Sequence, residues 1–406
     1  MNLMNRQFRL MIPITSLLIL LASCGQSSLT NTPESVGLSS DTLALADQKM
    51  QEFIDNGKWA GISTLVMKDD KIVQRAQYGY SNIEMELPVE KNTIFRIFSM
   101  TKPITAVALM MLYEKGMFEL DDKVSDFIPE FADVKVYNSE TKSLDPQEEE
   151  LTIRHLLTHS SGIVYGWGQS HVDSLYRVSG VGAWDSATIG DKVKILTQLP
   201  LKFQPGTAWE YGLSIDVAGY LVEVLSGIPL DEYFKSKIFD PLHMDDTGFY
   251  VPEEKLDRLS EIYYRDGEGE LKSGGFMAEA FKKPPVLFSG GGGLVSTIDD
   301  YLSFCRMLLH GGTLNGVKIL EASTVKMIMS NQLPETASYQ DGIGYGLSGQ
   351  VDLESGEYSW AGAASTNFWI DPSEQIIIIT FAQLMPGDYS YANVFYDLVK
   401  HALIKK

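Results

Sequence analysis

Residues 98–103 read Phe98-Ser-Met-Thr-Lys-Pro103 and lead directly into the apolar run Ile104-Thr-Ala-Val-Ala-Leu-Met-Met111. This run, closed by Gly116, predicts a buried helix over residues 100–115. Pro103 fits the first turn of such a helix, where no backbone donor is required. Ser99 therefore stands at the helix start, among free backbone N–H groups and at the positive end of the helix dipole.

The spacing Ser-x-x-Lys places Ser99 and Lys102 on one helical face, where the amine can approach the hydroxyl. A lysine in a water-poor pocket loses its proton more easily and can activate a serine as a nucleophile. The alternative is that Ser99 only caps the helix and Lys102 is solvated. The same spacing occurs at Ser139–Lys142, in a polar acidic stretch, and at Ser323–Lys326, in an ordinary amphipathic pattern.

The flanking sequence predicts strands near both ends of the chain and helices between them. Residues 62–68 and 72–80 form a hairpin pattern around Asp69-Asp70-Lys71, and short apolar or β-branched runs recur at 344–347, 358–361, 366–370 and 376–382. Helical patterns cover residues 40–56, 152–159, 213–226 and 391–404, whereas residues 135–150 are expected to be an exposed loop and residues 160–210 irregular. The interpretation is an α+β fold whose antiparallel sheet is built from both termini, with a mainly helical lobe inserted.

The composition is that of a chain with a large core. Of 406 residues, 44% are hydrophobic and 11% aromatic, so disorder of the whole chain is excluded. The net charge of −20 argues against nucleic-acid binding, because the phosphate backbone would be repelled. The sequence has two cysteines, and if Cys24 carries a lipid, Cys305 has no partner, so no intramolecular disulfide is expected. Cys305 lies in an amphipathic helical pattern and is expected to be a small buried hydrophobe.

The first 23 residues have the pattern of a secretory signal. Arg6 and Arg9 precede an apolar run that ends in Leu21-Ala-Ser-Cys24. This ending looks like a bacterial lipoprotein box, which implies a lipid on Cys24, a polar tether over residues 24–33, and an exported, membrane-anchored protein on the periplasmic or cell-surface face. The alternative is a plain signal peptide with an incidental cysteine.

Several other kinds of site lack support. The sequence contains no G-x-S-x-G and no phosphate-binding G-x-x-x-x-G-K-[ST], and Gly290–Gly293 is interpreted as a passage where backbones approach closely. His155 and His159 have metal-pair spacing but no intervening Glu, which favours a structural role. No metal or organic cofactor is implied.

Five ordered segments resemble the serine β-lactamases and penicillin-binding proteins, especially the class C type. They are Phe98–Pro103, Leu151–Gly162, Pro205–Gly219, Ser289–Thr297 and Trp360–Thr366. The resemblance implies a β-lactamase-like fold with one catalytic domain over residues 34–405. Its sheet lobe would comprise residues 34–90 and 285–405, its helical lobe residues 100–280, and the active site would lie between them.

The resemblance also implies roles for individual residues. Ser99 would be the acylated nucleophile, Lys102 the amine that takes its proton, and Tyr211 a partner in general-base and proton-shuttle duty. The backbone amides of Ser99 and Ala363 would form the oxyanion hole, and Gly362 belongs with Ala363 to the third motif, on the strand edge beside the nucleophile.

Two departures from the class C pattern bear on the substrate. Leu213 replaces the asparagine of the second motif, which removes a hydrogen bond to a substrate amide, and Trp360 replaces the lysine of the third, which weakens the grip on a substrate carboxylate. Both changes resemble the family VIII carboxylesterases. The expected function is hydrolysis of a small-molecule ester through an acyl-Ser99 intermediate. The alternatives are a D-amino-acid amide peptidase or D,D-carboxypeptidase, a weak β-lactamase, or a non-catalytic anchored binding protein.

Overall fold

The computed structural model describes residues 31–404 except Phe276. The predicted signal segment, the lipidation site at Cys24 and most of the predicted tether lie outside the described residues. No helix within the described part is long and apolar enough to cross a bilayer.

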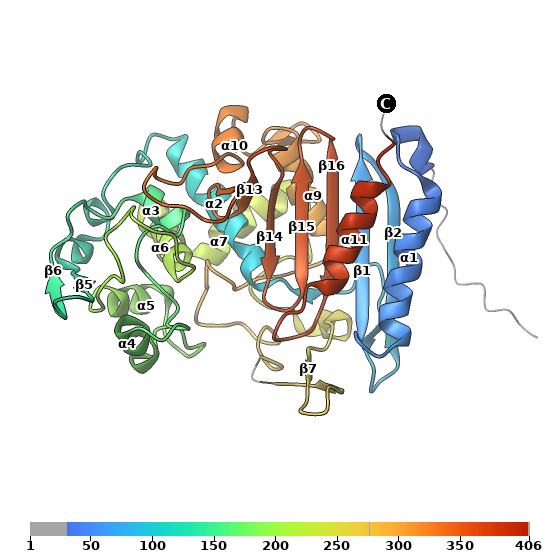
Figure 1. Ribbon diagram of the computed structural model, residues 1–406, viewed down its shortest axis with the longest axis horizontal. Helices are drawn as coiled ribbons and strands as arrows, with labels where there is room; N and C mark the ends of the chain where they lie inside the picture. The colour runs from blue at the N-terminus through green and yellow to red at the C-terminus, as the bar shows by residue number, and fades with distance from the viewer. Residues whose placement is uncertain (1–30, 276, 405–406) are drawn as a thin grey trace, which may run out of the picture.

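The centre of the fold is an eight-stranded antiparallel sheet made from both ends of the chain, as predicted (Figure 1). Its order is β12-β13-β14-β15-β16-β1-β2-β3. The N-terminal part supplies β1 (Gly61–Lys68), β2 (Lys71–Asn82) and β3 (Leu87–Pro88), and the C-terminal part supplies β12 (Ile343–Tyr345), β13 (Gln350–Asp352), β14 (Tyr358–Gly362), β15 (Thr366–Asp371) and β16 (Ile376–Ala382). The two parts join where β1 pairs with β16, from Ile62 opposite Ala382 to Lys68 opposite Ile376.

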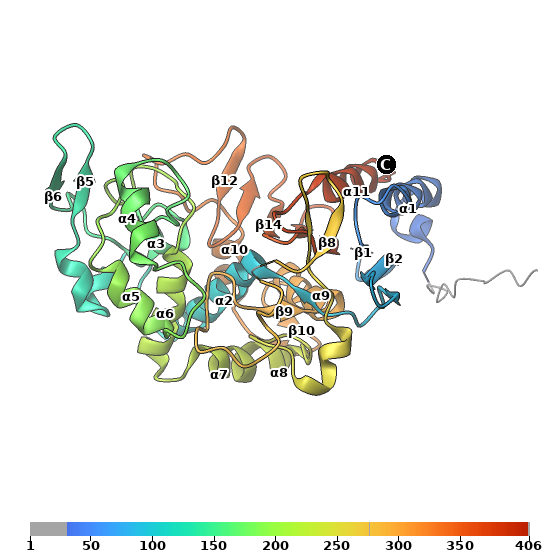
Figure 2. The same cartoon turned by 90° about the horizontal axis from the view of Figure 1, so that it is seen from below.

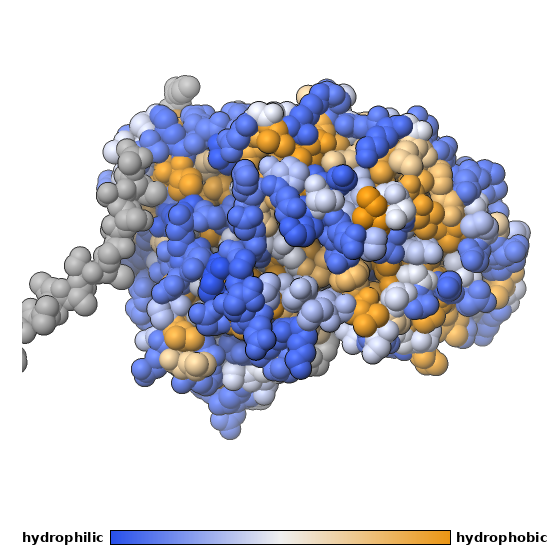
Figure 3. Space-filling model, turned by 180° about the vertical axis from the view of Figure 1, so that it is seen from behind, coloured by the Kyte–Doolittle hydropathy of each residue, from blue (hydrophilic) through white to orange (hydrophobic). Residues whose placement is uncertain are grey.

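Helices cover both faces of the sheet. The terminal helices α1 (Ser40–Asp55) and α11 (Ser390–His401) lie together on one face, where a core of buried residues seals them to β1 and β16 (Figure 1). Helix α9 (Ile298–Leu309) packs on the opposite face and carries Cys305, which is fully buried. Viewed from behind, hydrophilic side chains separate the apolar patches (Figure 3), as expected when large apolar side chains are mostly buried.

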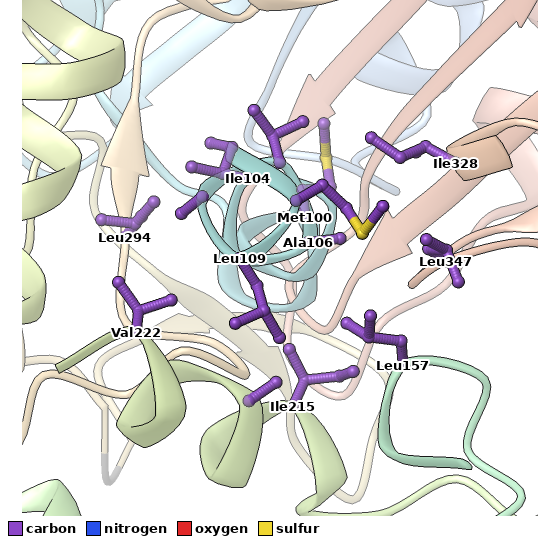
Figure 4. Close-up of a cluster of buried hydrophobic side chains, with 14 of the residues drawn as sticks. Met100, Ile104, Ala106, Leu109, Leu157, Ile215, Val222, Leu294, Ile328 and Leu347 are labelled. Atoms are coloured by element: carbon purple, nitrogen blue, oxygen red, sulfur yellow. The ribbon is translucent and has the colours of Figure 1, made fainter. Parts of the chain in front are cut away.

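The mainly helical lobe lies at the end of the molecule opposite α1 and α11, and α2 (Thr101–Tyr113) runs between this lobe and the sheet (Figure 2). Because α2 is apolar on all sides, it is buried nearly all round. Figure 4 shows Ile104, Ala106 and Leu109 of α2 surrounded by side chains from α6 (Ser214–Ser226) and from both halves of the chain. Burial of this helix fixes the position of the segment that precedes it, which contains Ser99.

The structure corrects two expectations about the middle of the chain. Residues 135–150, predicted as a loop, contain a hairpin of β5 (Val136–Asn138) and β6 (Ser143–Asp145). Residues 160–210, predicted as irregular, contain α4 (His171–Ser179) and α5 (Ile189–Leu196). Each of these helices begins with a capping box, Ser170 with Asp173 and Thr188 with Asp191, which satisfies the free N–H groups of a short helix.

The remaining elements are short. The helices are α3 (Ile153–Leu157), α7 (Leu230–Phe234), α8 (Asp240–Leu242) and α10 (Ala322–Ile328). The strand pairs are β4 (Phe95–Arg96) with β9 (Val295–Ser296), β7 (Tyr263–Arg265) with β8 (Leu271–Ser273), and β10 (Thr313–Leu314) with β11 (Val317–Lys318). The short helical turns are η1 (Pro33–Val36), η2 (Phe98–Met100), η3 (Val124–Asp126), η4 (Pro129–Asp133), η5 (Lys235–Phe239) and η6 (Glu253–Arg258).

Candidate active site

Ser99 lies in the 3₁₀ turn η2, which continues directly into α2. The preceding residue, Phe98, has a left-handed backbone with φ of 41°. This conformation costs roughly 1–3 kcal/mol for a residue other than glycine and clusters at functional sites. Phe98 and Met100 are buried, whereas Ser99 is only partly buried and lines a cavity. The strained turn thus leaves the serine hydroxyl accessible while its neighbours anchor in the core.

Lys102 is fully buried one helical turn beyond Ser99. Its Nζ lies 3.2 Å from Ser99 Oγ, 3.2 Å from Tyr165 Oη and 2.5 Å from the carbonyl oxygen of Gly291. No carboxylate within the described residues forms an ion pair with it. The amine therefore contacts the serine hydroxyl in a polar but largely water-free setting, as a base for that hydroxyl requires.

Tyr211, which precedes α6, completes the group. Its Oη donates a hydrogen bond of 2.7 Å to Ser99 Oγ, and Lys102 Nζ lies 4.6 Å from the centre of its ring. The fold therefore brings together the three side chains that the sequence singled out, although they come from segments 112 residues apart. A proton on the serine hydroxyl has both a basic amine and a phenol within reach.

Tyr165 belongs to the same cluster and was missed by the sequence analysis. It accepts a hydrogen bond from Lys102 and lies with its ring 5.3 Å from that of Tyr211. Burial raises the pKa of the Tyr165 phenol, and the nearby Tyr211 and Asp216 raise it further, so the phenol stays neutral at pH 7. Nothing local marks this residue, because its neighbours in space come from other segments.

The prediction that backbones approach closely at Gly290–Gly293 is confirmed. The side chain of Asp216 also lies against this glycine run, which the sequence did not indicate. The buried Asp216 accepts hydrogen bonds from the Ser289 hydroxyl at 2.6 Å and the Gly291 N–H at 3.1 Å. A Cβ at Gly291 would lie 2.5 Å from Asp216 Oδ2, so a side chain there would displace the Asp216 carboxylate. Asp216 thereby fixes the residue whose carbonyl oxygen holds Lys102. Burial raises the pKa of Asp216, and the charge of Lys102 opposes that rise.

Asp216→Asn is expected to lower kcat/KM for an ester about tenfold, roughly 1.4 kcal/mol in transition-state stabilisation, with little change in Tm. Asp216 Oδ1 accepts both observed hydrogen bonds, and the side-chain oxygen of an asparagine can accept them as well. The variant therefore removes mainly the buried negative charge near Lys102. Steady-state kinetics and thermal unfolding of the two proteins measure this. Unchanged kcat/KM would show that the carboxylate only holds the turn.

Ser99 and Ala363, whose backbone amides are predicted to form the oxyanion hole, both line the larger cavity. Ala363 follows the end of β14, and Gly362 lets that strand approach closely, because a Cβ there would lie 2.2 Å from the carbonyl oxygen of Ile97. The Tyr389 hydroxyl also donates to the carbonyl oxygen of Gly362 at 3.1 Å. These contacts hold the strand end beside the serine.

The two histidines with metal-pair spacing make structural contacts. His155 Nδ1 accepts a hydrogen bond from the Thr152 N–H in a capping box, and His159 is buried against the ring of Tyr211. Burial lowers the pKa of both imidazoles, that of His155 to about 4. Residues 31–404, leaving aside Phe276, contain no cluster of three potential ligands. The structural role predicted for the pair agrees with these contacts.

Comparison with known proteins agrees with this geometry. The family model for Beta-lactamase matches residues 46–400. The chain belongs to the β-lactamase family. Esterase EstB of Burkholderia gladioli is 31% identical over 279 residues, which cover 64% of this chain and 67% of EstB. Lovastatin esterase of Penicillium rubens is 27% identical over 366 residues, covering 79% of this chain and 87% of that protein.

A solved structure of EstCE1, described as a hydrolase with promiscuous acyltransferase activity, superposes with a TM-score of 0.76 at 25% identity. The match covers 88% of this chain and 98% of EstCE1. The fold predicted from the sequence is thus confirmed, and this β-lactamase family member is an enzyme of the serine hydrolase type.

The two positions at which this family member departs from the class C pattern both lie at the cavities. The ring of Trp360 is 5.6 Å from that of Tyr211 and meets Tyr345 edge-on at 5.3 Å, so it forms an aromatic wall next to the serine. Leu213 is nearly buried and lines a second, smaller cavity. The other two Ser-x-x-Lys pairs, at Ser139 and Ser323, border neither cavity.

Proposed function

We propose that the chain hydrolyses uncharged carboxylic esters through an acyl-enzyme at Ser99. The observation that carries this proposal is the contact of Ser99 Oγ with Lys102 and Tyr211 at the edge of a cavity that no charged side chain of the described residues lines. Such a cavity offers aromatic and neutral polar contacts to a substrate but no cation to hold a carboxylate.

The proposed reaction has two balanced stages. In the first, Ser99 Oγ bonds to the ester carbonyl carbon and its proton passes to the amine of Lys102. The negative charge on the carbonyl oxygen is stabilised by the amides of Ser99 and Ala363. When the bond to the leaving alkoxide breaks, that oxygen receives the proton through Tyr211. In the second stage a water gives one proton to the same pair and its oxygen bonds to the acyl carbon. The bond between that carbon and Ser99 Oγ then breaks, Oγ takes the proton back, and the acid is released.

The competing functions use the same machinery on different substrates. A D,D-carboxypeptidase or a β-lactamase acts on substrates that carry a carboxylate, for which a cation near the third motif is useful, whereas a D-amino-acid amide carries none. Trp360 supplies no such cation. A non-catalytic binding protein is disfavoured by the intact contacts of Ser99 with Lys102 and Tyr211.

A substrate panel tests the proposal. Purified protein is assayed with p-nitrophenyl acetate and butyrate, with nitrocefin, and with a D-Ala-D-Ala peptide. We expect kcat/KM for the esters to exceed the others by at least about tenfold, which corresponds to 1.4 kcal/mol. Faster turnover of nitrocefin or the peptide would favour the competing hydrolases. Failure of a fluorophosphonate probe to label Ser99 would favour the binding protein.

Trp360→Lys is expected to shift the preference toward anionic substrates. The lysine would place a cation beside the reacting centre, where a charge-assisted hydrogen bond to a carboxylate contributes about 1.5–3 kcal/mol. We expect the ratio of kcat/KM for nitrocefin to that for p-nitrophenyl butyrate to rise about tenfold. Trp360→Met, which removes the ring without adding charge, is the matched control. If this ratio changed equally in both variants, the size of the side chain at position 360 rather than its charge would set the preference.

We also propose that the enzyme is an exported lipoprotein anchored through Cys24, on the basis of the sequence pattern alone. Metabolic labelling with a fatty acid in a bacterial host should label the wild-type protein and leave Cys24→Ala unlabelled. Equal labelling of both proteins would refute the anchor.

A further inference from the structure

Ser99 lies where two cavities meet. The larger has a volume of about 1090 Å³ and extends toward the sheet, and the smaller has a volume of about 580 Å³ and extends into the helical lobe. The residues that line both are Ser99, Trp167, Met277, Ala363 and Met385. An ester whose carbonyl carbon is held at Ser99 must therefore send its acyl part into one cavity and its alcohol part into the other.

The larger cavity suits an uncharged group that contains rings. Its walls include the aromatic rings of Trp167, Tyr211, Tyr339 and Trp360. Its lining also includes neutral amides and a hydroxyl: Gln350, Ser359, Asn367 and Asn393. Stacked or edge-on aromatic contacts favour a flat or cyclic ligand, and a charged one would lose its hydration without an opposite charge to replace it.

The smaller cavity suits an aliphatic chain. Its walls include Val181, Ile189, Leu196, Leu213 and Leu287, and the rings of Phe98, Tyr165, Tyr176 and Trp184 also belong to the lining. Its charged side chains are already engaged, and among them Asp216 accepts hydrogen bonds from Ser289 and Gly291. Lys192 pairs with Asp185 at 2.9 Å, and Arg177 donates to the carbonyl oxygens of Gly166 and Gly168. The smaller cavity therefore offers an apolar surface rather than a site for a charged group.

The position of Tyr211 decides which part of the ester enters which cavity. On the reaction proposed above, the leaving oxygen takes its proton through Tyr211, so the alcohol must lie on the side of that phenol. Tyr211 lines only the larger cavity, whereas Tyr165 and Leu213 line only the smaller one. The acyl part then points away from Tyr211 and into the helical lobe.

We infer that the substrate is an ester of an uncharged, ring-bearing alcohol, bound in the larger cavity, with an aliphatic acyl chain bound in the smaller one. This inference rests on the proposed function and adds the substrate class and its orientation. The bonds made and broken are those of the proposed reaction: the ester C–O bond breaks, the alcohol leaves with the proton from Ser99, and water later releases the acid.

Two matched substitutions test the orientation. Ala361 lines only the larger cavity, two residues before Ala363, and Ala183 lines only the smaller one. Ala361→Phe and Ala183→Phe add the same group on opposite sides of Ser99. The substrates are p-nitrophenyl acetate as reference, 2-naphthyl acetate with a larger alcohol, and p-nitrophenyl octanoate with a longer acyl chain.

We expect Ala361→Phe to lower the ratio of kcat/KM for 2-naphthyl acetate to that for the reference at least tenfold, with the octanoate ratio unchanged. Ala183→Phe should lower the octanoate ratio at least tenfold and leave the naphthyl ratio unchanged. The reverse pattern would overturn the orientation, and insensitivity of both ratios would overturn the use of the cavities as subsites. Ala361→Leu and Ala183→Leu serve if a phenylalanine variant does not fold.

A second measurement tests the inference that the alcohol part of the substrate is uncharged. In the wild-type enzyme, 6-carboxy-2-naphthyl acetate should be turned over at least tenfold less efficiently than 2-naphthyl acetate. Equal turnover would overturn the assignment of an uncharged alcohol. If the wild-type enzyme turned over none of these esters, the proposed function itself would fail, which is distinct from the patterns above.

Discussion

Ser99→Ala is expected to lower kcat/KM for p-nitrophenyl acetate by about 10,000-fold or more, because loss of the nucleophile leaves only binding and the oxyanion donors. In the structure Ser99 Oγ is the atom on which Lys102 and Tyr211 converge, and no other serine hydroxyl of the described residues is hydrogen-bonded to both. The fold should be unaffected, since the alanine keeps the backbone and removes a hydroxyl whose hydrogen bonds are those with Lys102 and Tyr211. Initial rates and fluorophosphonate labelling measure the effect.

The chain offers its own control for this variant. Ser323 and Lys326 have the same Ser-x-x-Lys spacing and are exposed on α10, and neither lines either cavity, so Ser323→Ala should retain wild-type turnover and labelling. Residual activity above about 1% in Ser99→Ala would contradict the assignment of the nucleophile.

The second large effect is expected for Lys102. Lys102→Met keeps a long, unbranched side chain but removes the amine, and we expect kcat to fall by about 1,000-fold, within the range for general-base groups. Lys102→Arg should be about equally impaired, because a guanidinium keeps its proton and cannot act as a base. Stopped-flow or steady-state assays over pH 6–9 on both variants measure this.

Lys326→Met, at the same spacing from Ser323, is the matched control and should behave as wild type. An active Lys102→Arg would contradict the role of base and show that Lys102 is needed only as a cation. Because Lys102 is fully buried, thermal unfolding of each variant separates a loss of chemistry from a loss of fold.

Local patterns in the sequence were sufficient to predict the helix and the strands that carry the site. The apolar run over residues 100–115 predicted α2, and the apolar or β-branched runs predicted β14, β15 and β16 nearly at their observed bounds. The Asp69-Asp70 turn predicted the β1–β2 hairpin, and both residues adopt the left-handed conformation that such a tight turn requires. These features depend on neighbours within a few residues, so they can be recognised without the fold.

The same sequence did not reveal α4 and α5, because each is short and lies among glycines and tryptophans that suggest irregular structure. Their capping boxes, Ser170-x-x-Asp173 and Thr188-x-x-Asp191, were the available signal. Likewise the polar residues 135–150 hid a hairpin whose strands are too short and exposed to show alternation.

The sequence by itself determined which residues could perform the chemistry, since Ser99, Lys102 and Tyr211 were recognised from motif order before any distance was known. Only the tertiary structure decided how they are supported and what they face. Tyr165 and Gly291 contact Lys102 from two separate segments, and Asp216 holds Gly291 from a third. The two cavities arise where the sheet, the β7–β8 hairpin and the helical lobe enclose Ser99. The physical reason is that a motif records neighbours along the chain, whereas burial, charge and cavity shape are properties of neighbours in space.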